Sequence, residues 1–227
     1  MTTKLSVEDY FHQIRNIYSD AGQAHIAEGQ VAYMKNNFDF FGIKAPVWAT
    51  LLRAFFKENG VFAGENLKEF ARMCFSEPQR ELHYLAIEMC QKAVKNESED
   101  FIYFLEELIL SKSWWDSVDW LAKLVAGHFE RFPHQIRPIT EGWLASKNMW
   151  LQRTAITFQR YYKGKTDSEM LFEYVQRVAH SKQFFIQKGS GWALREYAKI
   201  NPQAVLDFVK TNDLPPLTRR EAVRLIQ

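Results

Sequence analysis

Apolar residues recur three or four positions apart along almost the whole chain, which is the spacing of one face of an α-helix. Near the N-terminus this stripe is formed by Tyr10, Phe11, Ile14, Ile17 and Tyr18. β-Branched residues are scattered, and no Asn-Gly or Asp-Gly pair marks a hairpin between two strands. The pattern therefore predicts an all-α protein.

Helix ends are expected where capping residues flank the apolar stripes. Ser6 with Asp9 forms a capping pair for the first helix. Pro46 suits the first position of another segment, 46–59, and Gly60 suits the position just after its end. The segments expected to be helical after the first stripe are 23–35, 46–59, 65–75, 78–94, 100–110, 113–128, 134–145, 149–162, 167–180, 190–199, 202–210 and 218–226.

A serine returns every 35 residues through the middle of the chain, at Ser76, Ser111, Ser146 and Ser181. The last three are followed by lysines, at Lys112, Lys147 and Lys182. Each serine opens an aromatic-rich segment, and two helical segments fit in each period, which is typical of stacked helix pairs. We therefore expect one domain over residues 1–227, a gently curved stack whose second helices line the concave face.

Composition narrows the class of protein further. Hydrophobic residues make up 47% and charged residues 25% of the chain, which is typical of a folded protein. No apolar run is long enough to span a membrane, and Met1–Leu5 lacks the apolar stretch of a secretory signal. With only Cys74 and Cys90, a disulfide scaffold is not expected. These features indicate a cytoplasmic protein.

The net charge of +2 is unevenly distributed. Residues 1–132 hold 14 Lys and Arg against 19 Asp and Glu, whereas residues 133–227 hold 15 against 8. A basic C-terminal half favours an anionic partner such as nucleic acid. A solvated basic surface with no partner explains the same imbalance.

The segment 113–120 concentrates two neighbouring tryptophans and two carboxylates. Asp116 lies three residues after Ser113 at an expected helix start, so a capping role explains it. Trp115 and Asp119 are four residues apart and share one helix face. Asp119 lies beyond the first turn, where capping does not apply, and is a candidate for stabilising a cation. The alternative is an ion pair with Lys112 or Lys123.

Two later segments add candidate anion-binding groups. Arg153 and Arg160 are seven residues apart on one helix face, and the planar guanidinium suits phosphate, although surface ion pairs are an equally ordinary use. Gly189, Ser190 and Gly191 are expected to lead into a helix whose first N–H groups remain open to an anion. A bare helix entry explains the same glycines.

Other chemistries find no support in the sequence. The six histidines show no metal-ligand spacing, and no phosphate-loop or Gly-x-Ser-x-Gly motif occurs. Neither cysteine has a basic or helix-start setting that activates a thiolate. We therefore expect neither a metal nor a cofactor.

Taken together, four segments resemble the AlkD family of bacterial DNA alkylation-repair glycosylases. They are residues 33–44, 112–119, 148–155 and 188–197, and they follow the family's order over nearly the whole chain. The resemblance implies HEAT-like helical repeats that hold double-stranded DNA in a basic concave groove. It also implies a monomer that is associated with the bacterial nucleoid when bound to DNA.

The resemblance further implies that N3- and N7-alkylated purines are released by cleavage of the N-glycosidic bond, for base excision repair. By this similarity, Asp119 is the catalytic carboxylate and Trp115 and Trp192 flank the deoxyribose. Arg153 contacts the DNA backbone and Tyr33 lies beside the active site. The remaining candidate DNA contacts in the matched segments and their helices are Lys44, Arg160, Lys188, Gly189, Ser190 and Arg195.

The chemistry agrees with this reading. Alkylation makes the purine a cationic leaving group, and charge moves to an oxocarbenium-like sugar as the bond breaks. A carboxylate about 4 Å away, at an effective dielectric constant near 20, contributes on the order of 4 kcal/mol, or roughly a thousandfold in rate. Indole faces attract the same positive charge. Cationic lesions are therefore the expected substrates.

Two other functions fit a helical solenoid. The same groove could bind distorted or branched DNA without catalysis, or the stack could be a protein–protein scaffold. Asp119 beside Trp115 argues against a pure DNA binder, since an acid in a phosphate groove repels the ligand. The basic C-terminal half argues against the scaffold.

Overall fold

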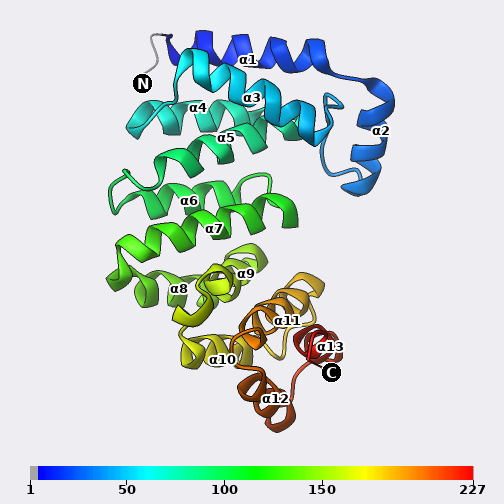
Figure 1. Cartoon of the computed structure of the whole chain (residues 1–227), viewed down its shortest axis with the longest axis vertical. Coiled ribbons are helices and arrows are strands. Elements are labelled where there is room, and N and C mark those ends of the chain that lie inside the picture. Colours follow the sequence, from blue (N-terminus) through cyan, green and yellow to red (C-terminus); the bar gives the residue numbers. More distant parts are fainter. Residues whose placement is uncertain (1–4, 227) are drawn as a thin grey trace. The chain divides into compact units, whose positions relative to one another are not determined.

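The computed structural model describes residues 5–226, which form thirteen α-helices joined by turns and loops (Figure 1). The helices are α1 (Val7–Ala21), α2 (Ala24–Tyr33), α3 (Ala45–Asn59), α4 (Gly64–Ser76), α5 (Arg80–Ala93), α6 (Phe101–Leu110), α7 (Trp115–Arg131), α8 (Ile136–Ala145), α9 (Met149–Thr157), α10 (Ser168–Arg177), α11 (Phe184–Ala198), α12 (Pro202–Thr211) and α13 (Pro216–Val223). Short 3₁₀ turns are η1 (Pro133–Gln135), η2 (Phe158–Tyr161) and η3 (Lys163–Lys165). Within residues 5–226 there is no β-strand, so the all-α prediction is confirmed.

Several helix ends follow directly from the sequence. Ser6 accepts a hydrogen bond of 3.1 Å from the N–H of Asp9 and caps α1. Pro46 is the second residue of α3, and Gly60 ends that helix with a φ of 76°. A positive φ is strained for other residues but not for glycine, which explains the stop.

Two expected helix starts are wrong. Helix α7 is capped by Trp114, because Ser113 instead donates its hydroxyl to the carbonyl of Ile109 at 2.6 Å and closes the preceding helix. Helix α11 begins at Phe184, six residues before the expected start at Ser190. Aromatic packing at Phe185 outweighs the low helix propensity of Gly189 and Gly191.

The 35-residue repeat marks equivalent turns between the two helices of each pair. The turns lie between α4 and α5, α6 and α7, α8 and α9, and α10 and α11. The hydroxyls of Ser76 and Ser146 each donate to the carbonyl three residues earlier, both at 2.7 Å. At these two positions the repeated serine therefore closes the first helix of a pair, while the hydroxyls of Ser146 and Ser181 also accept the N–H of the residue two positions later. Orphan carbonyls at a helix end need such a partner.

The chain divides into two compact units, with the division between Phe104 and Leu105. In unit 1 the ring of Tyr10 is fully buried and lies 4.7 Å from the rings of Phe55 and Phe62 and 5.2 Å from that of Phe70. Its hydroxyl donates to the carbonyl of Gly60 at 2.8 Å. This aromatic core joins α1, α3 and α4.

A buried carboxylate in unit 1 shapes the loop before α3. Glu81 accepts the N–H groups of Phe41, Gly42 and Ile43 at 3.0–3.2 Å. Burial raises the pKa of Glu81, while these hydrogen bonds oppose that shift. The φ of Gly42 is 89°, a value that lets three successive N–H groups converge on one carboxylate.

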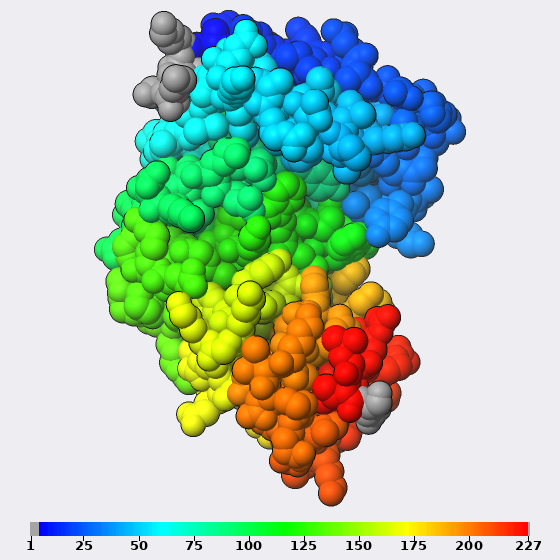
Figure 2. All heavy atoms as spheres, in the orientation of Figure 1, coloured from blue at the N-terminus to red at the C-terminus, as the bar shows by residue number. Residues whose placement is uncertain are grey.

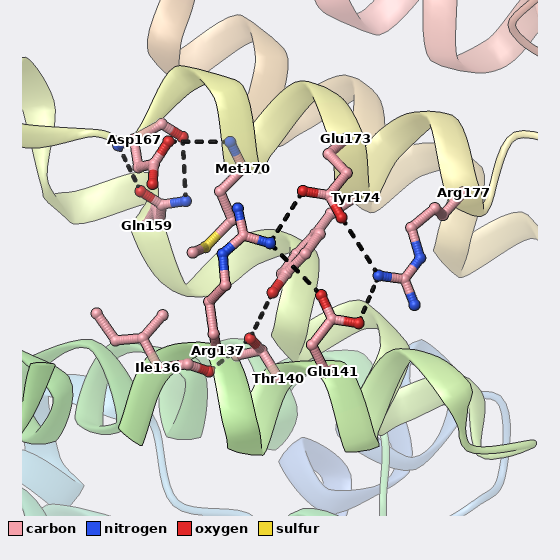
Figure 3. A network of polar contacts seen from close by, with 10 residues as sticks. All are labelled: Ile136, Arg137, Thr140, Glu141, Gln159, Asp167, Met170, Glu173, Tyr174 and Arg177. Atoms are coloured by element: carbon pink, nitrogen blue, oxygen red, sulfur yellow. Dashed lines mark hydrogen bonds and ion pairs between the residues drawn. The ribbon is translucent and has the colours of Figure 1, made fainter. Parts of the chain in front are cut away.

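In unit 2 the first helices of successive pairs are joined by polar contacts at one repeat spacing (Figure 3). Arg137 forms an ion pair with Glu173 at 3.0 Å, and Arg177 forms one with Glu141 at 2.6 Å. Beneath them, the hydroxyls of Thr140 and Tyr174 are 2.7 Å apart. These contacts link α8 to α10, and their partners are 34 or 36 residues apart. Two of the arginines that make the C-terminal half basic are therefore paired with glutamates.

The C-terminal helices close unit 2 by tight packing of α11 on α13, whose atoms meet in the orange and red part of Figure 2. A Cβ on Gly191 would lie 2.8 Å from the carbonyl oxygen of Thr218. Arg195 on α11 forms an ion pair with Glu221 on α13. The small residue and the ion pair together fix this interface.

Candidate active site

Three aromatic rings tie together the first turns of α7, α9 and α11. The ring centroid of Trp150 lies 5.9 Å from that of Trp114 and 5.0 Å from that of Phe185, while Trp114 and Phe185 are 5.2 Å apart. Pairs with this geometry contribute about 0.5–1.5 kcal/mol beyond their buried area. The cluster therefore fixes the side-by-side register of the three second helices.

About one turn further along α7 and α9, a carboxylate meets a guanidinium. Arg153 donates from Nε to Oδ1 of Asp119 at 2.8 Å and from Nη2 to Oδ2 at 2.9 Å. The side chain of Arg153 is 3% exposed and that of Asp119 is 14% exposed. Two parallel bonds hold the carboxylate in one orientation. Each carboxylate oxygen can accept a further hydrogen bond, so the exposed part of the Asp119 carboxylate can still accept one from a ligand or water.

Helix α11 completes the setting of Arg153. The third guanidinium nitrogen, Nη1, donates to the carbonyl of Phe185 at 2.6 Å. Gly189 faces the same guanidinium, since a Cβ there would lie 2.7 Å from Nη1 and 3.4 Å from Cγ of Arg153. Contacts below 3.0 Å force a neighbour to move, and Arg153 is held by three hydrogen bonds. We call Asp119, Arg153 and Gly189 the support row.

A second buried guanidinium supports Trp192. Arg160 is 8% exposed, and its Cζ lies 3.3 Å from the centroid of the Trp192 ring. Burial lowers the pKa of Arg160, and the negative charge of Asp119 opposes this shift. The indole N–H of Trp192 donates to Glu196 at 3.3 Å. The buried guanidinium of Arg160 thus supports the position of the Trp192 ring.

Trp115 is the first residue of α7 and is half-buried. It precedes Asp119 by four residues, which places both on one face of the helix, as expected. Unit 2 therefore offers a fixed carboxylate on the same helix face as one indole, and a second indole whose ring lies against a buried guanidinium.

The model of the family described as DNA alkylation repair enzyme matches residues 14–226. The chain belongs to this DNA alkylation repair enzyme family. The match covers nearly the whole sequence, so the resemblance seen in the four segments is confirmed. A comparison with curated proteins finds no significant match.

Solved structures agree with this membership. A predicted DNA alkylation repair enzyme from Enterococcus faecalis is 31% identical, with a TM-score of 0.84 over 90% of this chain and 96% of that one. AlkD2 from Streptococcus mutans is 18% identical, with a TM-score of 0.62 over 88% of this chain and 99% of that one. Protein smu.31 from Streptococcus mutans UA159 is also 18% identical, with a TM-score of 0.61 over 79% and 98%. The last two show the shared fold.

In this DNA alkylation repair enzyme, two arginines make internal contacts that the sequence did not predict. Arg153, which is expected to contact the DNA backbone, is buried and donates to Asp119 and Phe185. Asp119 is paired with Arg153 and not with Lys112 or Lys123, the alternatives from sequence. Arg160 is likewise buried beneath Trp192. Both guanidiniums contact other groups of the candidate site, and their contacts with DNA stay predictions.

The expected anion site at residues 189–191 is wrong, because these residues do not form a helix start. Gly189 and Ser190 lie inside α11 and are buried, so their N–H groups are not at a helix start. Arg195 is paired with Glu221. Lys188 is exposed, with Nζ 5.5 Å from the ring centroid of Phe184, and its DNA contact stays a prediction.

Tyr33 and Lys44 belong to unit 1. Tyr33 is the last residue of α2, is 66% exposed, and borders an open hollow that also includes Met34 and Tyr84. Lys44 is exposed at the start of α3, directly after the loop held by Glu81. Their contacts with DNA stay predictions.

The hydrogen bond from Arg153 to the carbonyl of Phe185 and the packing of Gly189 against Arg153 were not expected from the sequence. A signal was available, because Trp150 and Phe185 are separated by 35 residues, the period of the serines. Aligning the segments by this period places aromatic residues at equivalent positions of the second helices. That register indicates which helices meet, although it does not show the hydrogen bond itself.

Among residues 5–226, no three His, Cys, Asp or Glu side chains gather in a metal-binding group. Every helix in this range is too short or too polar to cross a bilayer. Cys74 and Cys90 are buried free thiols, and burial raises the pKa of both.

Proposed function

We propose that this chain is a DNA glycosylase that hydrolyses the N-glycosidic bond of positively charged N3- and N7-alkylpurines in double-stranded DNA. The substrates are of the 3-methyladenine and 7-methylguanine type, and their removal starts base excision repair. Membership of the DNA alkylation repair enzyme family supports this class of substrate. We expect the protein to act as a monomer.

The observation that carries the proposal is the Asp119 carboxylate, held by two hydrogen bonds from a buried arginine beside Trp115. Groups that stabilise developing charge act best when they need no reorganisation during the reaction. As the purine leaves, positive charge develops on the deoxyribose, and the fixed carboxylate lowers the energy of that state. Its remaining acceptor positions can orient the attacking water.

The ion pair also limits the substrates. A lone carboxylate at about 4 Å and an effective dielectric constant of 20 contributes about 4 kcal/mol, and Arg153 offsets part of its charge. The rate enhancement is therefore below roughly a thousandfold. Such help suffices for a bond already weakened by a cationic base, whereas neutral bases are expected to be poor substrates.

Binding of distorted or branched DNA without catalysis is the second candidate function. The buried ion pair favours it, because Asp119 and Arg153 satisfy each other as in a purely structural pair. A protein–protein scaffold finds no such support.

The test is incubation of the chain with methylated duplex DNA, followed by chromatography of the released bases. We expect the native chain to release 7-methylguanine and 3-methyladenine. Asp119→Asn removes the negative charge while keeping the shape of the group, and should slow release by on the order of a hundredfold or more with equal or higher DNA affinity.

The matched control is Asp116→Asn, which removes the same charge from the first turn of the same helix. It should leave the release rate within about twofold. Full activity of Asp119→Asn removes this residue from the mechanism. Tight DNA binding by the native chain with no base released supports the second candidate.

A further inference from the structure

The three serine–lysine turns at residues 111–112, 146–147 and 181–182 play no part in the support row. Their lysines are exposed and lie two or three residues before the first residue of α7, α9 and α11. The positions are equivalent, because the lysines recur every 35 residues. Lys147 and Lys182 have no ion-pair partner among residues 5–226. The charges of Lys147 and Lys182 are therefore available to an anion.

Two of these turns are fixed by the same internal hydrogen bond. Gln152 donates from Nε2 to the carbonyl of Ser146 at 2.7 Å, and Gln187 donates likewise to Ser181 at 3.0 Å. Both glutamines come from the following helix, six residues after the serine. The backbone that carries Lys147 and Lys182 is thus held in a fixed turn. Less conformational entropy is therefore lost when a ligand orders the two lysine side chains.

The lysines run beside the support row. Asp119, Arg153 and Gly189 follow their lysines by six or seven residues, and they lie in the second turn of the helix that each lysine precedes. Helix α9 contacts both α7 and α11. Packed helices are about 8–10 Å apart, so three lysines span roughly 16–20 Å. That length corresponds to about five or six nucleotides at 3.4 Å each.

An open hollow of about 560 Å³ lies between the second and third turns. Its lining includes Gln152, Arg177, His180 and Lys182. Arg177 also pairs with Glu141, so Lys182 and His180 are the groups left to meet an anion in this hollow. The basic groups on its lining suit a phosphate diester better than an uncharged ligand.

We propose that Lys112, Lys147 and Lys182 bind successive stretches of the phosphate backbone of one DNA strand, beside the position of the damaged nucleotide. The proposal rests on the proposed function for its duplex DNA ligand. Contacts of this kind position the protein on DNA and carry no sequence information. They suit an enzyme that must find its lesion in any sequence.

The test measures the affinity for an undamaged duplex of about twenty base pairs at several salt concentrations. Each lysine–phosphate contact contributes about 0.9 to the slope of log affinity against log salt. Lys147→Ala with Lys182→Ala should lower the slope by about 1.8, and adding Lys112→Ala by about 2.7. Between 50 and 200 mM salt, the double variant should lose roughly tenfold less affinity than the native chain.

The matched control is Lys165→Ala with Lys210→Ala, which removes the same charge from exposed positions outside the turns. Its slope should equal the native slope, and Lys147→Arg with Lys182→Arg should keep it as well. An unchanged slope in the triple alanine variant overturns the proposal, as does an equal loss in the control.

A base-release measurement keeps this proposal separate from the proposed function. At subsaturating protein, the single-turnover release rate of the double alanine variant should fall in proportion to its loss of DNA affinity, whereas Lys165→Ala with Lys210→Ala should release bases at the native rate. If the native chain releases no base, the glycosylase proposal fails, while the salt slopes still decide the role of the lysines.

Discussion

Unit 2 contains two sets of ion pairs between repeat-equivalent positions, one exposed at the surface and one buried, and the two sets have different roles. Arg177 and Glu141 join two first helices at the surface, with side chains 39% and 37% exposed. Arg153 and Asp119 join two second helices, with side chains 3% and 14% exposed. The partners are 36 residues apart in the first pair and 34 in the second.

Burial separates their roles. An exposed pair contributes about 0–1 kcal/mol, since water and salt screen it and long side chains lose freedom. A buried pair gains little net stability, but removal of one partner leaves an uncompensated charge and is strongly destabilising. The surface pairs therefore tolerate change, whereas the buried pair fixes one geometry. The same repeat thus serves packing on one side and positioning on the other.

The largest effect is expected from Arg153→Met, which leaves the Asp119 carboxylate partly buried without its partner. The free energy of unfolding should fall by about 3–5 kcal/mol, and base release should be lost. Urea unfolding followed by circular dichroism measures the first quantity. Asp119→Asn with Arg153→Met should recover part of the stability, because no unpaired charge remains. Equal stability of Arg153→Met and the native chain would falsify the positioning role.

Gly189→Ala should have the next largest effect. The new methyl group meets Nη1 of Arg153 at 2.7 Å, so overpacking should lower the free energy of unfolding by about 1–3 kcal/mol. Displacement of Arg153 should also lower the release rate at saturating DNA, while DNA affinity and its salt slope stay native.

The control is Gly142→Ala on α8, where an added Cβ has no neighbour within 4 Å. This helical site should become more stable by about 0.5–1 kcal/mol, with native activity. If Gly189→Ala behaves like Gly142→Ala, the close approach of α11 to Arg153 is not needed.

The smallest effect is expected at the surface. A double-mutant cycle on Arg177→Ala and Glu141→Ala should give a coupling of about 0.2–1 kcal/mol, which shrinks as salt is raised from 0.05 to 1 M. Thermal unfolding of the four proteins provides the measurement. A salt-independent coupling of several kcal/mol would remove the contrast with the buried pair.

Local sequence determined most of the helices and their register. Ser6 at the start of α1, Pro46 and Gly60 at the ends of α3, and the 35-residue serine period all act through backbone groups within a few residues. The apolar stripe, the cap and the turn agree at these places, so the pattern alone indicates the structure. The pairing of Trp115 with Asp119 on one face is equally local.

Tertiary structure alone decided which side chains complete the site. The bonds of Arg153 join residues 34 and 32 positions away, and no local pattern separates such an arginine from one that faces solvent. Gly189 and Gly191 looked like a helix start because glycine weakens helices, yet they lie inside α11 because Arg153 and Thr218 leave no room for a Cβ. Close packing between distant segments, and not local propensity, set these positions.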